Sequence, residues 1–157
     1  MRRPWSKEYL VLDNLASIVV PDSNILNDYF GKYKLLASWR DPRDLNTAAR
    51  NLSGNDWVPK DPEAFVKWYK WYITRYLSVK NDNLLLIRFE DFVYHYEETS
   101  KKICDFLKLS QKNQEKKFAY FNQKISINNI GLYKNYSDQK AIDYITTNLK
   151  KYLYTLK

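Results

Sequence analysis

A short apolar strand that breaks at a proline between two arginines constrains this chain more than any other feature. Residues 34–39 predict a buried strand, because the run is apolar, brief and closed by a proline-containing turn. Pro42 lacks an N–H group and pushes the preceding residue toward extended geometry, so the strand must end there. Asp44 then suits an N-cap, and residues 45–52 are expected to form a helix that stops at Ser53-Gly54.

Two arginines, Arg40 and Arg43, are therefore expected at the carboxyl end of a strand, beside the free N–H groups of a helix start. In open α/β sheets ligands bind in that crevice, and the helix start favours anions. The planar guanidinium of arginine also matches two phosphate oxygens at once. The alternative is a surface turn in which the two arginines pair with Asp41 and Asp44. The motif alone leaves both interpretations open.

A second apolar strand, residues 84–88, ends in an aromatic residue and two acids. Phe89 would lie at the same sheet edge as Arg40, where a flat ring can stack on a nucleobase, a contact worth roughly 1–3 kcal/mol. The alternative is that Phe89 belongs to the core and that Glu90 or Asp91 caps the next segment.

The order of the expected elements indicates an α/β fold. Beyond the two strands, we expect helical turns at 24–30, helices at 61–79, 97–107, 112–121 and 139–153, and short strands at 9–12 and 17–20. Strand, helix, helix, strand and helix in that order imply parallel strands joined by right-handed crossovers, in three layers. With 157 residues and no evident linker, residues 1–157 are expected to form a single domain.

Composition excludes several classes of protein. Because the chain has one cysteine and one histidine, we expect no disulfide framework and no metal site. Without a transmembrane run or the apolar core of a signal peptide, we expect a cytoplasmic protein with no membrane partner. The net charge of +8 suggests a small basic RNA-binding protein, but the lysines are scattered rather than clustered, so nucleic acid is not the expected partner.

Several chemically interesting residues have a simpler structural interpretation. A helical stripe of aromatic residues lines an acceptor pocket or, as its spacing favours, packs in the core. The stripe consists of Trp68, Tyr69, Trp71, Tyr72 and Tyr76. Cys104 lies on the apolar side of an amphipathic helix without an activating base, so a core position is expected.

Three segments together resemble the sulfotransferase family. They are Arg40-Asp41-Pro42-Arg43-Asp44, the run from Ile87-Arg88-Phe89-Glu90-Asp91-Phe92 into the helix ending at Leu107, and Asn129-Ile130-Gly131-Leu132-Tyr133-Lys134-Asn135. Their order and spacing agree with the family from about residue 34 to 157. The resemblance implies a P-loop-NTPase-like three-layer sandwich with a parallel sheet, here without its first strand and loop. It also implies sulfuryl transfer from 3′-phosphoadenosine 5′-phosphosulfate to a hydroxyl or amine acceptor, such as a carbohydrate, lipid or small alcohol.

The resemblance assigns the nucleotide-binding residues. Arg40 is expected to hold the 3′-phosphate, with Arg43 beside it in the same motif. Ala48 stands where the family has a serine that shares this phosphate, with Thr47 adjacent. Phe89 replaces a tyrosine on the adenine side and keeps only the ring.

The family's Arg-Lys-Gly clamp on the 3′-phosphate is also missing. Its positions hold Ser126, Ile127 and Asn128, so Lys124 or Lys134 is expected to substitute in part.

The sulfuryl side departs further from the family. No glycine precedes Gly31, so the glycine-rich loop that cradles the phosphosulfate is missing. The usual histidine base is absent as well; Asp22 is the one acid near its place, and His95 is expected at the surface. The chain is therefore expected to be the carboxyl-terminal two-thirds of a sulfotransferase and inactive alone. Either it is the product of a truncated or interrupted gene, or a companion chain or an oligomer supplies the loop. The alternative is a non-catalytic nucleotide-binding or scaffold remnant of the same fold.

Overall fold

The computed structural model of the chain describes residues 26–30, 32–51, 57–109 and 121–155. Within them two strands, β1 (Leu35–Trp39) and β2 (Leu84–Arg88), pair in parallel from Leu35 opposite Leu84 to Trp39 opposite Arg88. Both strands and their parallel pairing agree with the sequence prediction. Because the strands are parallel and in register, the residues that follow each of them meet at one edge of the sheet.

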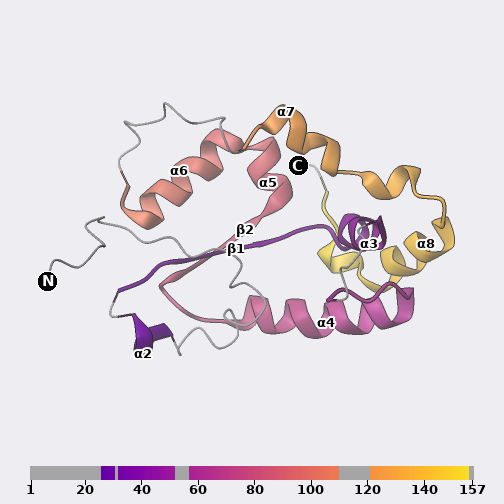
Figure 1. The fold of residues 1–157 in the computed structure, drawn as a ribbon, viewed down its shortest axis with the longest axis horizontal. Coiled ribbons are helices and arrows are strands. Elements are labelled where there is room, and N and C mark those ends of the chain that lie inside the picture. Colours follow the sequence, from indigo (N-terminus) through magenta and orange to yellow (C-terminus); the bar gives the residue numbers. More distant parts are fainter. Residues whose placement is uncertain (1–25, 31, 52–56, 110–120, 156–157) are drawn as a thin grey trace, which may run out of the picture.

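Helices lie on both sides of this small sheet. The helices are α2 (Leu26–Tyr29), α3 (Pro42–Asn51), α4 (Pro62–Ser78), α5 (Phe89–Tyr94), α6 (Tyr96–Leu107), α7 (Gln123–Ser126) and α8 (Gln139–Asn148), with 3-10 turns η2 (Ile127–Asn129), η3 (Leu132–Asn135) and η4 (Lys150–Tyr152). Figure 1 shows α4 on one side of the strands, α5 and α6 on the other, and α3 and α8 beyond their carboxyl ends. The α/β class with a parallel sheet is thus confirmed for this part of the chain.

Helix α4 carries most of the core, and its sequence explains where it begins. The Asp61 side chain accepts a hydrogen bond from the Ala64 N–H group at 2.8 Å, and Pro62 occupies the first helical position, where a missing N–H group costs nothing. Apolar residues at helical spacing then form one buried face. Phe65, Val66, Tyr69 and Ile73 pack with Ile145, Leu149 and Tyr152.

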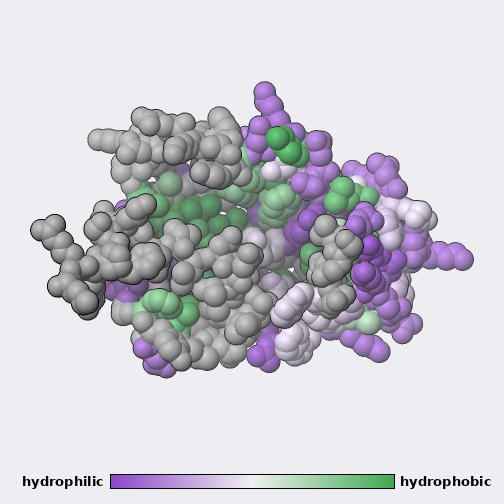
Figure 2. Space-filling view, in the orientation of Figure 1, coloured by the Kyte–Doolittle hydropathy of each residue, from purple (hydrophilic) through white to green (hydrophobic). Residues whose placement is uncertain are grey.

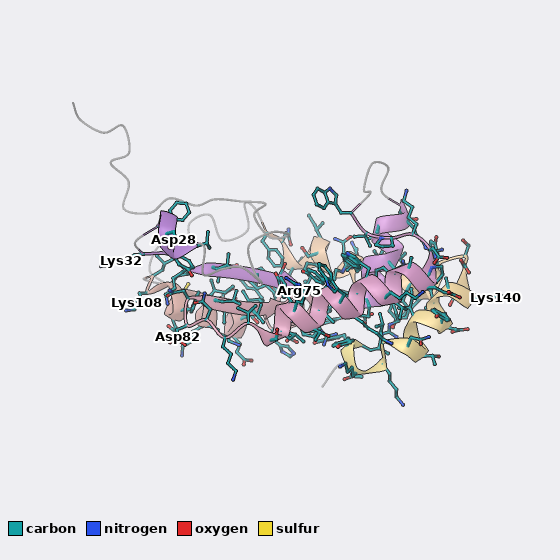
Figure 3. All side chains as sticks on the ribbon, turned by 90° about the horizontal axis from the view of Figure 1, so that it is seen from below. Asp28, Lys32, Arg75, Asp82, Lys108 and Lys140 are labelled. Atoms are coloured by element: carbon teal, nitrogen blue, oxygen red, sulfur yellow. The ribbon has the colours of Figure 1, made fainter. Side chains whose placement is uncertain are left out.

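The same helix also covers one face of the sheet. Along β1, Ala37 is buried against Tyr76 of α4, whereas Leu36 on the opposite face remains 41% exposed. Figure 3 shows α4 running alongside the strands, with Arg75 near its carboxyl end. In Figure 2 apolar side chains gather around the sheet, and the side that carries α8 is mostly hydrophilic.

The sequence predictions of where α3 begins and where the last helix ends need correction. Helix α3 begins at Pro42, so its N-cap is Asp41 rather than Asp44; an Asp41 carboxylate oxygen accepts from the Arg43 N–H group at 2.9 Å. Proline decides this start, because it is favoured at the first helical position. The last helix, predicted to run to residue 153, ends at Asn148 and is followed by the η4 turn.

Of the remaining predicted elements, one helix lies within the described residues and several segments lie outside them. Helix α6 runs from Tyr96 to Leu107, close to the predicted range 97–107. The predicted strands at 9–12 and 17–20, the body of the helix at 112–121 and Asp22 lie outside the described residues. Among the helices that the structure describes, none combines the length and apolar character needed to cross a bilayer.

The core role of α4 predicts a strong contrast between two of its aliphatic residues. Ile73 is fully buried, so Ile73→Ala should lower the free energy of unfolding by about 2–5 kcal/mol through lost burial and a cavity. Leu77, one turn later, is 44% exposed, so Leu77→Ala should change it by less than about 1 kcal/mol. Urea denaturation of both variants measures the difference. Equal losses would mean that α4 does not pack as described.

Candidate anion-binding site

The two strands bring Arg40 and Phe89 together. Arg40 directly follows β1 and Phe89 directly follows β2, and the guanidinium carbon of Arg40 lies 5.2 Å from the centre of the Phe89 ring. This is a cation–π distance, and it agrees with the sequence prediction that ring and arginine share one sheet edge.

A cavity of about 320 Å³ opens beside this pair. Its lining is Ser38, Trp39, Arg40, Leu45, Trp68, Tyr69, Tyr72 and Phe89. Trp68 and Tyr72 stack on each other, with ring centres 5.3 Å apart and planes within 5°. A flat-walled cavity with one cation at its margin suits a planar group that carries an anionic substituent.

The aromatic stripe of α4 contributes both to the core and to the lining of the cavity. Tyr69 and Tyr76 are fully buried and belong to the core. Trp68 and Tyr72 are half-buried and line the cavity, and Trp71 is 60% exposed outside both. Core packing therefore explains only part of the stripe.

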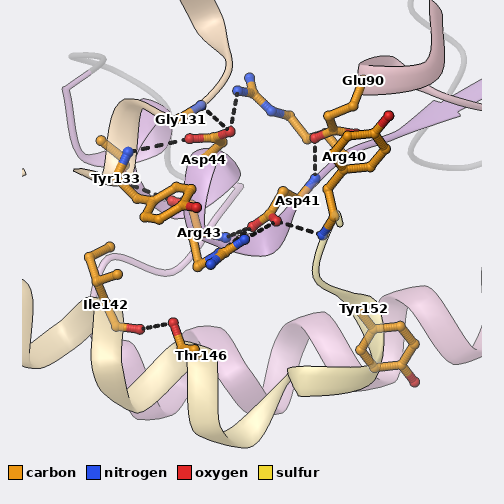
Figure 4. A network of polar contacts seen from close by, with 12 residues as sticks. Arg40, Asp41, Arg43, Asp44, Glu90, Gly131, Tyr133, Ile142, Thr146 and Tyr152 are labelled. Atoms are coloured by element: carbon orange, nitrogen blue, oxygen red, sulfur yellow. Dashed lines mark hydrogen bonds and ion pairs between the residues drawn. The ribbon is translucent and has the colours of Figure 1, made fainter. Parts of the chain in front are cut away.

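Arg43 is bound tightly within the protein. Its Nε and Nη2 donate to the two carboxylate oxygens of Asp41 at 2.9 and 2.7 Å, and its guanidinium lies 3.9 Å from the centre of the Tyr133 ring (Figure 4). Asp41 is 1% exposed and also accepts from the Tyr154 N–H group at 2.8 Å. Arg43 therefore pairs with Asp41, which is the alternative to a ligand contact that the sequence left open.

Arg88, the last residue of β2, is held just as firmly. Its Nε donates to Glu90 at 3.2 Å and its Nη2 to the Tyr152 carbonyl at 2.9 Å. Its guanidinium carbon lies 4.3 Å from the centre of the Trp39 ring and 4.9 Å from the centre of the Tyr154 ring. Sequence analysis did not single out this arginine as the anchor of the chain's last described residues.

Arg40 differs from the other two arginines. Its Nη2 donates to the Asn129 carbonyl at 2.6 Å and lies 4.0 Å from a carboxylate oxygen of Asp44. Its Nε is buried and has no partner among the described residues. An unpaired buried donor is costly, so this Nε–H group is a strong candidate to bind a ligand.

The sequence predicted Asp44 as a helix N-cap, but in the structure Asp44 binds a distant loop. It is 1% exposed and accepts from the Gly131 N–H group at 2.8 Å and the Tyr133 N–H group at 3.3 Å. Burial raises the pKa of Asp44, and these two hydrogen bonds and the charge of Arg40 oppose that rise. Asp44 therefore joins α3 to a loop far along the chain.

The other predicted residues lie on α3, on η3 and on α7. Ala48 is half-buried on α3, and Thr47 is buried with its hydroxyl donating to the Arg43 carbonyl at 2.9 Å. Lys134 is exposed on η3, and its aliphatic stem lies against Gly131. Lys124 is exposed on α7.

Two further residues carry no chemistry at this site. His95 is exposed between α5 and α6, as expected, and Cys104 is half-buried rather than in the core. In the part of the chain that the structure describes, no three histidine, cysteine or acidic side chains form a group that could hold a metal ion.

The buried Glu90 makes stability depend on pH in a defined direction. Glu90 is fully buried and accepts from the Asp41 N–H group at 2.6 Å. Burial raises its pKa above the ordinary 4.5, against the hydrogen bonds and the Arg88 charge. The folded state therefore binds a proton on Glu90 more tightly than the unfolded state does. The stability that this protonation contributes is present at low pH and is lost as the pH rises through the folded-state pKa of Glu90.

We therefore expect wild type to lose stability relative to Glu90→Gln as the pH rises from 4.5 through the raised pKa of Glu90. Urea midpoints of both proteins across this range measure the effect, and the comparison cancels the titration of all other groups. Parallel pH profiles would show that the pKa of Glu90 is not raised.

Sequence comparison finds similar proteins among the sulfotransferases. Rat sulfotransferase 2A1 is 32% identical over 93 residues, which cover 50% of this chain and 33% of that protein. Mouse sulfotransferase 2A2 is 29% identical over 93 residues, with the same coverage. The chain thus spans about a third of the length of the curated relatives it matches.

Neither of the other two comparisons identifies a relative. No protein-family profile matches the chain, and no solved structure matches it. The resemblance to the sulfotransferase family that the three motifs indicate is confirmed by these curated relatives, over half of the chain.

Proposed function

We propose that this chain is the nucleotide-binding, carboxyl-terminal part of a sulfotransferase that transfers a sulfuryl group from 3′-phosphoadenosine 5′-phosphosulfate to a hydroxyl or amine. One observation carries the proposal: Arg40 follows the end of β1 with a buried, unpaired Nε–H group and the Phe89 ring 5.2 Å away. This is the arginine to which the family resemblance assigns the donor's 3′-phosphate.

The site's chemistry suits such a nucleotide. An arginine donates two parallel hydrogen bonds to a phosphate, and charge-assisted bonds of this kind are among the strongest in proteins. The aromatic cavity beside Arg40 offers flat apolar surfaces for a base. In this proposal Arg40 binds the phosphate, Phe89 and the cavity wall contact the adenosine, and Arg43 holds the end of the strand in place through Asp41.

The supporting contacts of the phosphate are fewer than in the family pattern. Ala48 offers no hydroxyl, and the Thr47 hydroxyl already donates to a backbone carbonyl. Lys134 on η3 is then the second cation that we assign to the phosphate. With one arginine and one exposed lysine, binding should be weaker than with a complete clamp.

The sulfuryl side of the reaction needs groups that the described residues do not supply. The glycine-rich loop has no counterpart in the sequence, and Asp22 remains the proposed base. We propose that the β1–β2 unit is part of a P-loop-like sandwich and that a companion segment supplies the loop. The alternative function, nucleotide binding without catalysis, uses the same Arg40 site and differs only in transferring no sulfuryl group.

The assignment of Arg40 predicts a nucleotide preference. Adenosine 3′,5′-bisphosphate should bind more tightly than 5′-AMP, and Arg40→Gln should reduce its affinity by about ten- to a hundredfold, as expected for one charge-assisted contact. Titration calorimetry measures both. Arg75→Gln is the matched control, because Arg75 is exposed on α4 and stacks on Trp71. Equal affinities of wild type for the two nucleotides would rule out a 3′-phosphate site.

A gain-of-function variant tests the geometry of α3. Ala48→Ser should strengthen binding of the bisphosphate by about two- to tenfold if a hydroxyl at this position reaches the phosphate, the gain of one hydrogen bond. It should leave the affinity for 5′-AMP unchanged. If the affinity for the bisphosphate does not increase, the 3′-phosphate does not lie within reach of position 48.

Catalysis should require the missing loop. We expect residues 1–157 alone to transfer no sulfuryl group from the donor, and transfer to begin when a segment bearing a glycine-rich loop is supplied in the same chain or as a companion. A transfer assay with a panel of alcohols and amines measures this. Turnover by the chain unaided would show that residues 1–33 contain an unrecognised phosphosulfate site, whereas persistent inactivity with the loop supplied would favour the non-catalytic alternative.

A further inference from the structure

Two fully buried side chains hold the peptide group that joins Arg40 to Asp41. The Tyr69 hydroxyl donates to the Arg40 carbonyl oxygen at 3.0 Å, and a Glu90 carboxylate oxygen accepts from the Asp41 N–H group at 2.6 Å (Figure 4). Tyr69 is 1% exposed and Glu90 is inaccessible to solvent. Because β1 ends at Trp39, this peptide group lies just past the strand pairing, where its polar groups need partners other than the neighbouring strand.

The two side chains reach this peptide group from opposite sides of the sheet. Tyr69 belongs to α4 and Glu90 to the first turn of α5, and Figure 1 shows these helices on either side of the strands. In a planar trans peptide the carbonyl and N–H groups point in opposite directions, so one hydrogen bond on each fixes the plane of the peptide group. That plane determines the backbone geometry of Arg40, and with it the direction in which the arginine side chain leaves the sheet edge.

Both holding groups are themselves fixed in place. The Tyr69 ring packs against the rings of Phe65 and Tyr152, with 5.7 Å between ring centres in each case. Burial raises the pKa of the Tyr69 hydroxyl, so this group keeps its proton and remains a donor. The other carboxylate oxygen of Glu90 accepts from Arg88 Nε at 3.2 Å. The peptide group is therefore held by two side chains that have little freedom to move.

The side chain of Arg40 depends on this backbone support. It donates to the Asn129 carbonyl and lies over the Phe89 ring, but its buried Nε has no partner among the described residues. Arg43 and Arg88, in contrast, have carboxylate partners at 2.7 and 3.2 Å. An arginine with fewer side-chain contacts keeps its orientation largely through its own backbone. Orientation matters at such a site, because a bidentate contact to a phosphate requires a defined geometry.

We propose that Tyr69 and Glu90 are positioning residues of the anion site, which direct Arg40 toward the 3′-phosphate by holding the peptide group that follows it. For the identity of the ligand, the inference rests on the proposed function. The polar atoms of both residues are used on the backbone, so both act through Arg40. Tyr69 also lines the aromatic cavity, so a single residue shapes the cavity wall and holds the arginine beside it.

The first test removes the Tyr69 hydroxyl and keeps the ring. Tyr69→Phe should weaken binding of adenosine 3′,5′-bisphosphate by about three- to tenfold, the loss of one hydrogen bond, and leave the affinity for 5′-AMP unchanged, by calorimetry. Tyr76→Phe is the matched control and should bind both nucleotides like wild type, since Tyr76 is also fully buried on α4 but packs against Ala37. Equal losses for the two nucleotides in Tyr69→Phe, or no loss for the bisphosphate, would overturn the proposal.

The second test separates the hydrogen bond of Glu90 from its charge. Glu90→Gln keeps an acceptor at the same reach and loses the charge beside Arg88, whereas Glu90→Asp keeps the charge and withdraws the acceptor by one methylene group. Positioning needs the reach to the Asp41 N–H group. Glu90→Asp should therefore reduce the preference for the bisphosphate over 5′-AMP about threefold more than Glu90→Gln does. The opposite order would mean that Glu90 acts through its ion pair with Arg88, and would contradict the proposal.

The third test needs no nucleotide. The Arg40 guanidinium lies against the Phe89 ring, whose ring current shifts the NMR signal of the Arg40 Nε–H proton. In Tyr69→Phe this signal should move toward its value in an unfolded chain, and in Tyr76→Phe it should stay as in wild type; Arg40→Gln identifies the signal by removing it. If the signal does not move in Tyr69→Phe, the positioning proposal is wrong even when the nucleotide binds. If it moves but wild type does not prefer the bisphosphate, the proposed function is wrong and the positioning role stands.

Discussion

The buried carboxylate of Asp41 is the interaction on which the rest of this structure depends. It caps α3 through the Arg43 N–H group, binds the Arg43 guanidinium with both oxygens, and accepts from the Tyr154 N–H group. Its own N–H group donates to the fully buried Glu90. One side chain thus joins the end of β1, the start of α3 and the last described residues of the chain. Removing one member of such a buried pair is expected to cost about 3–5 kcal/mol, because the other charge is left uncompensated.

This network also decides which arginine is available for a ligand. Arg43 is paired with Asp41 and Arg88 with Glu90, each in close contact with a nearly inaccessible carboxylate. Among the described residues, the acidic partner of Arg40 is Asp44, at 4.0 Å, and that carboxylate already accepts from two backbone N–H groups. Three arginines at one sheet edge would otherwise repel one another. Pairing two of them internally leaves Arg40 as the arginine that, among the described residues, lines the aromatic cavity.

Local signals explain how much of this could be predicted from the sequence. The two apolar runs and the proline after Asp61 predict elements through contacts within a few residues, and all of these elements are present. The meeting of Arg40 and Phe89 follows from parallel pairing alone. Asp44 was misassigned because a cap signal three residues after another cap is locally ambiguous, and only Pro42 decides between the two.

The partners of the site could not be predicted in the same way. The Asp44 carboxylate meets Gly131 across 87 positions of the chain, and Asp41 meets Tyr154 across 113. The residues around Asp41 and Asp44 in the sequence give no indication of these distant partners. Such contacts depend on how the crossover helices place distant loops, which hydrophobic periodicity does not specify. The candidate site residues could be recognised in the sequence, but the hydrogen bonds and ion pairs among them could not.

The position of Lys134 makes the two cations of the proposed site dependent on each other. The Lys134 stem packs on Gly131, and its N–H group donates to the Gly131 carbonyl, so its ammonium belongs to the part of the loop that Asp44 anchors. Arg40 holds the other end of the same loop at Asn129. A substitution of Arg40 is therefore expected to alter the position of Lys134 as well. Their contributions to anion binding should not add, because residues that share one structural element are energetically coupled.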